Sequence, residues 1–151
     1  MLAFLTVLAV MLVTDVGAVN VKVIDGDSLF VNNKEVRLEG IDAPEYHQQC
    51  FDADDKLYDC GKYAYEYLKD IIGDDVECQY VAKDKYKRSV AICYSQGVCL
   101  NEQMVRQGWA VAYDRYTKNY VDEEVDAKEN KRGIWQGRFM RPELYRVLHK
   151  D

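Results

Sequence analysis

The chain has 151 residues, 48% of them hydrophobic and 30% charged, which suits one globular domain with its own core and leaves no room for a second. Its formal net charge of −6 counts against a protein that holds polyanions by bulk electrostatic attraction. The charge is nevertheless uneven, because residues 42–59 are acidic whereas residues 127–151 carry seven Lys or Arg side chains.

The first 18 residues differ in composition from the rest of the chain. Residues 2–13 form an apolar run, and no charged side chain precedes Asp15. Such a run is short for a membrane span and typical of the core of a signal peptide. We therefore expect residues 1–18 to be a signal peptide cleaved after Ala18, and residues 19–151 to form a single exported domain. The alternatives are an uncleaved membrane anchor and a misassigned start, since no Lys or Arg precedes the run.

Residues 21–41 have the alternating pattern of three short strands. The first strand starts at residue 21 and runs into an acidic turn at residues 25–27, the second covers residues 28–31, and the third covers residues 35–41. Asn32 and Asn33 tolerate the positive φ that a two-residue hairpin turn requires. We therefore predict an antiparallel hairpin centred between these two asparagines.

This hairpin brings several carboxylates to one place. Asp42, at the end of the third strand, lies within a few residues of Asp25 and Asp27 in the predicted register. The proline after Ala43 favours an extended conformation there, which offers the Ala43 carbonyl and the Glu45 side chain to the same neighbourhood. Oxygen ligands of this kind suit a hard cation such as Ca²⁺. The alternative is an ordinary acidic turn beside a solvated loop.

Arg37 lies on the third strand beside these carboxylates. Its guanidinium is either a salt-bridge partner or a fork for a phosphate, and a cation together with such a fork is what phosphodiester chemistry requires. Strict alternation places Arg37 on the face opposite Asp42, whereas bulges at Gly26 and Gly40 would change its facing. The pattern leaves the orientation of Arg37 open.

Two further strands are predicted at residues 76–82 and 88–94, joined by the turn KDKYK. If this turn is centred between residues 85 and 86, Cys78 lies opposite Cys93 on the neighbouring strand. We therefore predict a Cys78–Cys93 disulfide. Five cysteines in all agree with an oxidising compartment.

The remaining cysteines are Cys50, Cys60 and Cys99. We predict a second disulfide between Cys50 and Cys60, which would close the acidic loop that follows Glu45 and leave Cys99 as a free thiol. The competing interpretation is a zinc site. It is disfavoured because the spacings contain no C-x-x-C pair and the chain has only two histidines.

Three helices are predicted between and after these strands. The first covers residues 62–72 and carries an apolar stripe on one face. The second follows Leu100 and stops at Gly108. The third begins near Tyr120, with acidic residues in its first turn, where they complement the helix dipole.

Five motifs now stand in order: IDGDSL, VRLEGIDAPE, DKYKRSVAICY, MVRQGWAVAY and KRGIW. Over residues 19–135 their order and spacing resemble the staphylococcal nuclease (thermonuclease) family, and in particular its secreted bacterial branch with cysteines after the APE motif. The resemblance implies an α+β fold that is mainly β, with three helices packed on a five-stranded OB-fold barrel. It also implies a calcium-dependent phosphodiesterase.

The resemblance assigns roles to matching positions around the acidic hairpin. Asp27, Asp42 and the backbone carbonyl of Ala43 would bind Ca²⁺, with Asp25 behind them as a nearby acid. Glu45 would be the general base that activates water.

The resemblance also assigns the groups that would hold the substrate. Arg37 and Arg88 would clamp the phosphate as negative charge builds up, and Lys85, Tyr86 and Tyr113 would bind the nucleotide. One departure is Lys87, which stands where many members of the family have glycine.

Together these expectations describe a secreted or periplasmic calcium-dependent endonuclease that hydrolyses DNA and RNA. A cleft with tyrosine platforms favours single-stranded substrates, and we expect a monomer with no stable membrane association once the signal is cleaved. The alternative function is a non-catalytic OB-fold module that binds nucleic acid. It is disfavoured because such a module has no need of Glu45 together with both Arg37 and Arg88.

Overall fold

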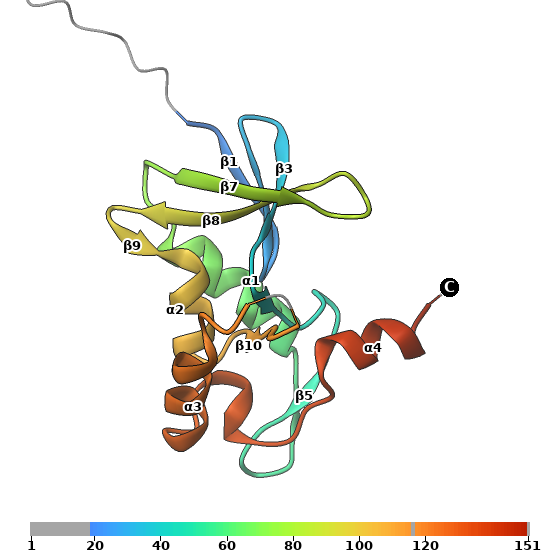
Figure 1. Ribbon diagram of the computed structural model, residues 1–151. Coiled ribbons are helices and arrows are strands. Elements are labelled where there is room, and N and C mark those ends of the chain that lie inside the picture. Colours follow the sequence, from blue (N-terminus) through green and yellow to red (C-terminus); the bar gives the residue numbers. More distant parts are fainter. Residues whose placement is uncertain (1–18, 116, 151) are drawn as a thin grey trace, which may run out of the picture.

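A curled mixed sheet organises the chain in the computed structural model, which describes residues 19–115 and 117–150 (Figure 1). The predicted signal peptide, residues 1–18, lies outside the described residues. The strand order is β1-β2-β3-β8-β7, with β3 and β8 parallel and the other neighbours antiparallel. The strands are β1 (Val21–Asp25), β2 (Ser28–Val31), β3 (Lys34–Leu38), β7 (Glu77–Lys83) and β8 (Ser89–Ser95), with β9 (Val98–Cys99) paired to β8. This partly open barrel of five main strands confirms the predicted α+β class.

The β2–β3 hairpin has the predicted register. Asn32 and Asn33 adopt φ values of 48° and 64°, and the flanking strands pair Leu29 with Val36. The third strand is shorter than predicted, because the chain turns at Gly40, whose φ is +75°. It resumes as β4 (Ile41–Asp42), which pairs with β10 (Val111–Ala112) instead of continuing along the sheet.

Four α-helices lie within the described residues, one more than predicted. They are α1 (Cys60–Ile71), α2 (Leu100–Arg106), α3 (Val121–Glu129) and α4 (Pro142–Leu148), and a short 3₁₀ helix, η1 (Gly133–Gln136), precedes α4. A small hairpin of β5 (Cys50–Phe51) and β6 (Leu57–Tyr58) precedes α1. In Figure 1, α2 and α3 lie side by side, whereas α4 stands apart from the other helices at the C-terminal end.

The main core lies between the sheet and helices α1 and α2. Its fully buried members come from both layers, namely Leu29, Val36, Leu38, Leu68 and Met104. A second, smaller cluster contains Cys50, Cys60, Val111 and Ile134. This smaller cluster joins the loop after β4 to η1.

Both predicted disulfides are present. They join Cys50 to Cys60 and Cys78 to Cys93, and the second bridge links directly paired residues of β7 and β8. Cys99 is in no disulfide. Disulfides of this kind are typical of extracellular or periplasmic proteins. None of the helices among the described residues is both long and apolar enough to cross a membrane.

We expect removal of the bridge between β7 and β8 to destabilise the fold. Its cysteines are 15 residues apart, and a loop of that length corresponds to about 3 kcal/mol in the chain-entropy model. The double substitution Cys78→Ser with Cys93→Ser should lower the free energy of unfolding in urea by about that amount. Cys99→Ser is the control and should change it by less than about 0.5 kcal/mol. Equal stability of the double variant and the parent would contradict this expectation.

Candidate active site

Two buried carboxylates form the centre of the site. Asp27, in the β1–β2 turn, is 6% exposed, and Asp42, at the end of β4, is 1% exposed. The backbone N–H of Ala43 donates a hydrogen bond of 2.7 Å to Asp27 Oδ2. The short path from β3 through Gly40 to β4 therefore brings Asp42 and Ala43 to Asp27, as the hairpin register predicted.

Arg37 on β3 joins the two carboxylates. Its Nη1 lies 2.8 Å from Asp27 Oδ1, and its Nη2 lies 3.4 Å from Asp42 Oδ1. The same guanidinium donates to the carbonyls of Asp27 at 3.2 Å and Ile41 at 3.0 Å. The Arg37 side chain, whose orientation the sequence left open, thus points toward Asp27 and Asp42. The alternation is broken by an irregularity between Val23 and Asp25 in β1 and by the turn after β3.

Asp25 is a third carboxylate next to Asp27, and it fixes the backbone of the β1–β2 turn. Its Oδ1 accepts hydrogen bonds from the Asp27 N–H at 3.1 Å and from Ser28 Oγ at 2.6 Å. Burial raises the pKa of Asp27 well above its ordinary value, Arg37 opposes this shift, and the charges of Asp25 and Asp42 add to it. The folded chain therefore holds a carboxylate where negative charge is unfavourable, and added positive charge would relieve it.

The donor types at this point fit a hard cation. Asp27 and Asp42 offer carboxylate oxygens, and Ala43 offers a backbone carbonyl, as Ca²⁺ prefers. Within the described part of the chain, however, no three His, Cys, Asp or Glu side chains are grouped closely enough to hold a metal ion. A cation here would depend on the carbonyl and on water to complete its coordination.

Arg146 of α4 is a site residue that the sequence analysis missed. Its Nη1 lies 2.7 Å from Asp42 Oδ1 and 2.9 Å from Glu45 Oε1, and its Nη2 lies 3.1 Å from Asp42 Oδ2. Partial burial lowers the pKa of Arg146, but the hydrogen bonds and charges of Asp42 and Glu45 outweigh it, and the pKa is raised. The side chain is therefore a permanent cation that holds Asp42 at both oxygens.

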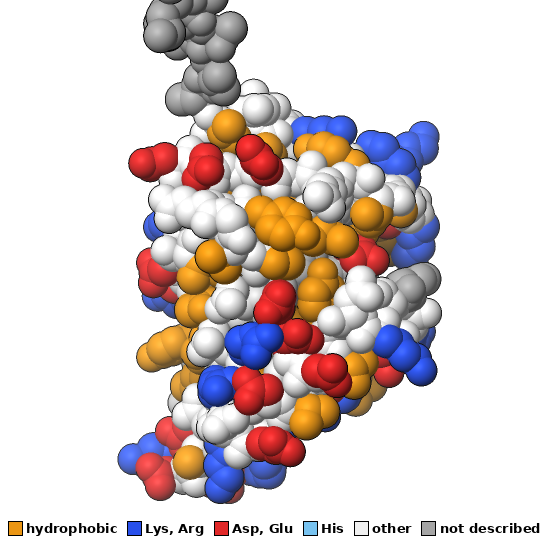
Figure 2. Space-filling model, turned by 60° about the vertical axis from the view of Figure 1, so that its left-hand side comes forward, with side chains coloured by type: hydrophobic (Ala, Val, Ile, Leu, Met, Phe, Trp, Pro, Cys, Tyr) orange, Lys and Arg blue, Asp and Glu red, His pale blue; other side chains and the backbone are white. Residues whose placement is uncertain are grey.

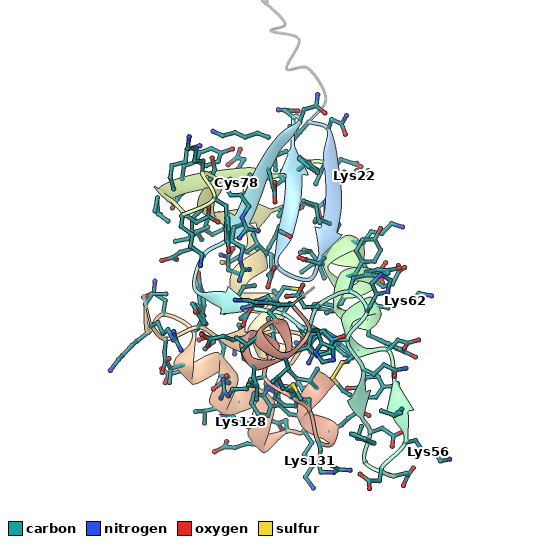
Figure 3. All side chains as sticks on the ribbon, turned by 90° about the vertical axis from the view of Figure 1, so that its right-hand side faces the viewer. Lys22, Lys56, Lys62, Cys78, Lys128 and Lys131 are labelled. Carbon is teal, nitrogen blue, oxygen red and sulfur yellow. A yellow bond between two sulfur atoms is a disulfide. The ribbon has the colours of Figure 1, made fainter. Side chains whose placement is uncertain are left out.

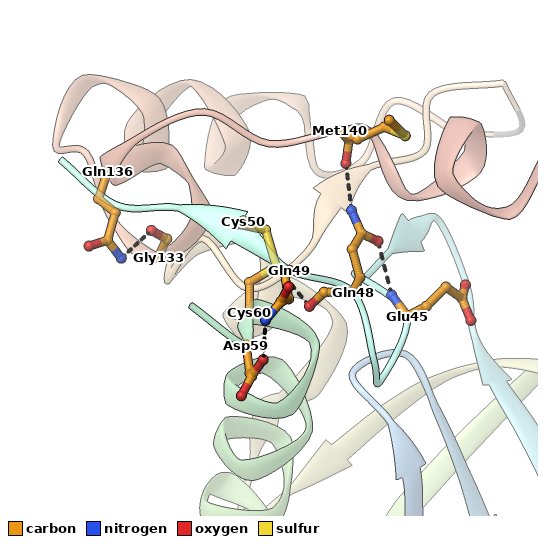
Figure 4. Close-up of a disulfide and its surroundings, with 9 residues drawn as sticks. All are labelled: Glu45, Gln48, Gln49, Cys50, Asp59, Cys60, Gly133, Gln136 and Met140. Atoms are coloured by element: carbon orange, nitrogen blue, oxygen red, sulfur yellow. Dashed lines mark hydrogen bonds between the residues drawn. A yellow bond between two sulfur atoms is a disulfide. The ribbon is translucent and has the colours of Figure 1, made fainter. Parts of the chain in front are cut away.

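The backbone around Glu45 is held by Gln48, by the start of α1 and by the segment before α4 (Figure 4). The fully buried Gln48 accepts the Glu45 N–H at 3.2 Å and donates from Nε2 to the Met140 carbonyl at 2.7 Å. A Cβ at position 61 would overlap the Glu45 carbonyl oxygen, so the start of α1 can approach this loop only with Gly61 there. The loop that carries Glu45 is thus held between α1 and the residues before α4.

Arg88 directly precedes β8, the strand paired with β3, and its ion pairs among the described residues are with side chains other than the buried carboxylates. Its Nε lies 2.7 Å from Asp84 Oδ2, and its Nη1 lies 3.7 Å from Glu35 Oε1. Partial burial lowers the pKa of Arg88, yet the hydrogen bond and charge of Asp84 prevail and raise it. Asp84 is a second residue that the sequence analysis missed.

Asp84 also shapes the β7–β8 turn. Its Oδ1 accepts the backbone N–H groups of Tyr86 and Arg88, each at 2.9 Å. Lys87 adopts a φ of +64°, the left-handed conformation for which glycine is favoured. The departure from glycine at this position therefore leaves the tight turn intact.

The residues expected to bind nucleotides occupy two different places. Tyr86 is 66% exposed, with Lys85 Nζ 5.1 Å and the Arg88 guanidinium 5.6 Å from its ring centroid. Tyr113 follows β10, where its N–H donates to the Gly40 carbonyl at 2.8 Å and Arg115 lies 5.8 Å from its ring. Tyr86 is thus an exposed ring near two cations, whereas Tyr113 lies next to β4.

The surface charge is mixed. Figure 2 shows a face on which acidic and basic side chains surround a central hydrophobic group. On the face that carries α4, the five lysines labelled in Figure 3 lie around the periphery. The positive charges that contact the buried acids are those of Arg37 and Arg146.

We expect Arg146→Met to destabilise the protein in the presence of chelator. The substitution removes charged hydrogen bonds from the buried Asp42, each worth about 1.5–3 kcal/mol. The free energy of unfolding should fall by about 1–3 kcal/mol, because the Arg146 side chain is 37% exposed and water can take its place beside Asp42. Arg141→Met, which removes an exposed arginine before α4, is the matched control. An equal loss in both variants would argue against a special role of Arg146.

We expect the stability of the Asp27→Asn variant, relative to that of the parent, to increase as pH rises. The pKa of Asp27 is raised in the folded state, so the unfolded chain releases this proton first, and the parent loses stability from about pH 4 upward. The free energy of unfolding of Asp27→Asn minus that of the parent should therefore increase between about pH 4 and pH 8. The measurement is urea unfolding in chelator over this range, with Asp54→Asn in an exposed loop as control. A flat or falling difference would contradict the raised pKa.

Comparison with known proteins identifies the chain at the level of family. Residues 35–137 match the family model described as "Staphylococcal nuclease homologue". Succinoglycan biosynthesis protein ExoI of Rhizobium meliloti (strain 1021) is 34% identical over 140 residues, which cover 86% of this chain and 73% of that protein.

Two further relatives are named as endonucleases. An uncharacterized endonuclease of Haemophilus influenzae is 33% identical over 76% of this chain and 64% of its own length. Endonuclease YhcR of Bacillus subtilis (strain 168) is 31% identical over 76% of this chain but only 11% of its own length. Arg37, Asp42, Glu45 and Arg88 fall inside the region matched by the family model, whereas α4 lies beyond it. The chain belongs to the staphylococcal nuclease family of phosphodiester hydrolases.

Proposed function

We propose that this protein is a secreted or periplasmic calcium-dependent endonuclease that hydrolyses DNA and RNA. The observation that carries the proposal is the bridge from Arg37 to the buried pair Asp27 and Asp42, with Glu45 joined to Asp42 through Arg146. Acids that attract a cation therefore lie beside a guanidinium that would exchange part of these contacts to donate hydrogen bonds to a phosphate. Metal-assisted phosphodiester hydrolysis requires both.

In this proposal Asp27, Asp42 and the Ala43 carbonyl hold Ca²⁺, and Asp25 orients Asp27. When bound, the cation supplies positive charge that polarises the phosphate and orients water. Asp27 and Asp42 are themselves buried from bulk solvent, and charges in such surroundings interact more strongly than charges in water.

Glu45 is the proposed general base. Arg146 contacts its Oε1, and Oε2 would accept a proton from the attacking water. Its backbone is held by Gln48 and packed against Gly61, so the carboxylate projects from a fixed loop. A positioned base of this kind contributes on the order of 10²- to 10⁴-fold to the rate.

Arg37 and Arg88 are the proposed phosphate clamps. Arg37 comes from β3, and Arg88 directly precedes β8, the parallel neighbour of β3. Arg88 is held by Asp84 at the edge of the site and would exchange part of this contact for phosphate oxygens. Preorganised cations stabilise the charge that develops on the phosphoryl oxygens in the transition state.

Tyr86, Lys85 and Tyr113 are the proposed nucleotide contacts. The exposed ring of Tyr86 offers a stacking surface beside two cations. Stacking on aromatic rings requires unpaired bases and tolerates any sequence. This supports a preference for single-stranded DNA or RNA.

The proposed setting follows from the two disulfides, which suit an oxidising compartment. Residues 1–18 would act as a cleaved signal peptide, and residues 19–151 would form one domain that works as a monomer without stable membrane association. The mixed surface charge agrees with recognition of a strand at one site.

The direct test is digestion of single-stranded DNA with Ca²⁺ and with chelator. The parent should cleave only with Ca²⁺, and Glu45→Gln should lower kcat by about 10²- to 10⁴-fold. Arg37→Met and Arg88→Met should each cost about 10²- to 10³-fold. Glu66→Gln, an exposed position on α1, is the matched control and should cleave like the parent.

Two outcomes would overturn the enzymatic proposal. One is the absence of Ca²⁺-dependent cleavage by the parent, and the other is a Glu45→Gln variant as fast as the parent. Binding of single-stranded DNA without cleavage would favour the non-catalytic OB-fold module instead.

A further inference from the structure

An open groove of about 490 Å³ lies between α4, the end of β1 and the loop after β4. Its volume is within the usual range of small-ligand sites, about 300–1,000 Å³. Glu45 and Arg146 line the groove on the side of the proposed active site. The α4 wall lies beyond residues 35–137, so the family match does not account for it.

Flat aromatic rings line this groove from two separate elements. On α4, the rings of Tyr145 and His149 stack with centroids 4.0 Å apart and an interplanar angle of 19°. From the loop after β4, Tyr46 and His47 line the groove, with their rings edge to face at 5.0 Å. Tyr46 is also braced by Tyr65 of α1 at 5.3 Å and is 36% exposed.

The charges around the groove fit a neutral, flat ligand attached to an anion. The carboxylates of Asp25 and Glu45 line it, which disfavours an anionic group among the rings. Arg146 is already occupied by Asp42 and Glu45. Lys150, at the end of the chain after α4, also lines the groove and could contact a phosphate. A nucleobase on a sugar–phosphate strand has this combination of features.

The strand order of the sheet gives the position of the groove relative to Arg37, the proposed phosphate contact. The groove lies at β1, whereas Tyr86 lies in the β7–β8 turn, and the strand order β1-β2-β3-β8-β7 puts Arg37 on β3 between them. A nucleic acid strand that crosses Arg37 would therefore meet aromatic rings on both sides of its contact with Arg37.

We propose that the groove binds one unpaired nucleobase of the substrate strand, on the opposite side of the cleaved bond from Tyr86. The inference rests on the proposed nuclease function, because it assigns a second nucleotide subsite to the same strand. Tyr145 and His149 supply one stacking surface, and Tyr46 supplies the other. Stacking requires a base free of its complementary strand, so the groove gives this chain a physical reason to select single strands.

The binding test uses the full chain in chelator, so that the probe is not cleaved. The probe is a short single-stranded deoxyoligonucleotide that contains 2-aminopurine, whose fluorescence falls when the base stacks. The parent should quench the probe with saturation. Tyr145→Leu with His149→Leu should weaken binding by about 5- to 150-fold, the range for one base that loses its stacking partner.

Two control variants separate stacking from folding. Val147→Ala alters an exposed side chain of the same helix and should bind like the parent. Tyr145→Phe with His149→Phe keeps both flat rings and should also bind like the parent. Equal binding by the parent and the double leucine variant, or no binding by the parent, would overturn the groove assignment.

A cleavage test distinguishes failure of this inference from failure of the proposed function. With Ca²⁺, a single abasic nucleotide is placed in turn at each position around the mapped cleavage point. One position on the side opposite Tyr86 should raise KM for the parent and have no further effect on the double leucine variant. Absence of such a position would overturn the assignment of the groove as a nucleobase site and leave the proposed nuclease function intact. Absence of any cleavage by the parent would overturn the nuclease function, and the fluorescence experiment would still decide whether the groove binds a base.

Discussion

The site depends on the neutralisation of two buried carboxylates by guanidinium groups. Asp27 and Asp42 are almost fully buried, and an unpaired charge in such a place costs several kcal/mol. Arg37 contacts both acids, and Arg146 holds both oxygens of Asp42. One cation comes from the sheet and the other from the last helix, so the electrostatic balance of the site ties the C-terminal segment to the barrel. Burial raises the pKa of Asp27 well above its ordinary value, and the charge of Arg37 opposes this shift.

Much of the remaining structure fixes the loops that carry these charges. Gln48 joins the Glu45 loop to the residues before α4, and Gly61 lets α1 approach the same loop. The buried Asn101 of α2 donates to the Glu39 carbonyl and accepts the Cys93 N–H, which ties the turn after β3 to β8. Polar groups in the interior are thus used to position loops, and the hydrophobic core supplies the rigid support. Proteins commonly accept a less stable arrangement of charge at a functional site in this way.

The features that could be predicted from the sequence were those set by local rules. The Asn32–Asn33 turn fixes the β2–β3 register, and the same pairing logic placed Cys78 opposite Cys93. The facing of Arg37 could not be predicted, because it depends on a break in the pairing of β1 and on the turn at Gly40. The contact of Arg146 with Asp42 joins residues 104 positions apart, and α4 has only seven residues, too few for hydrophobic periodicity to reveal a helix. Asp84 was visible in the sequence as a turn residue, but its bond to Arg88 needs the exact path of the turn.

The two contacts of Arg146 have different consequences for the C-terminal helix. Each Asp42 oxygen accepts a hydrogen bond from Arg146, and a carboxylate oxygen has more than one acceptor position, so a second cation at Asp42 would share this carboxylate with Arg146. The contact with Glu45 and the backbone bond from Gln48 to Met140 do not involve Asp42, and Arg115 holds Glu143 of α4 at 2.8 Å. These contacts can keep α4 against the barrel while the charge at Asp42 changes. The contacts of α4 that do not involve Asp42 therefore attach this helix to the barrel independently of Asp42, and in the proposed calcium-bound state they would keep the aromatic side of α4 beside Glu45.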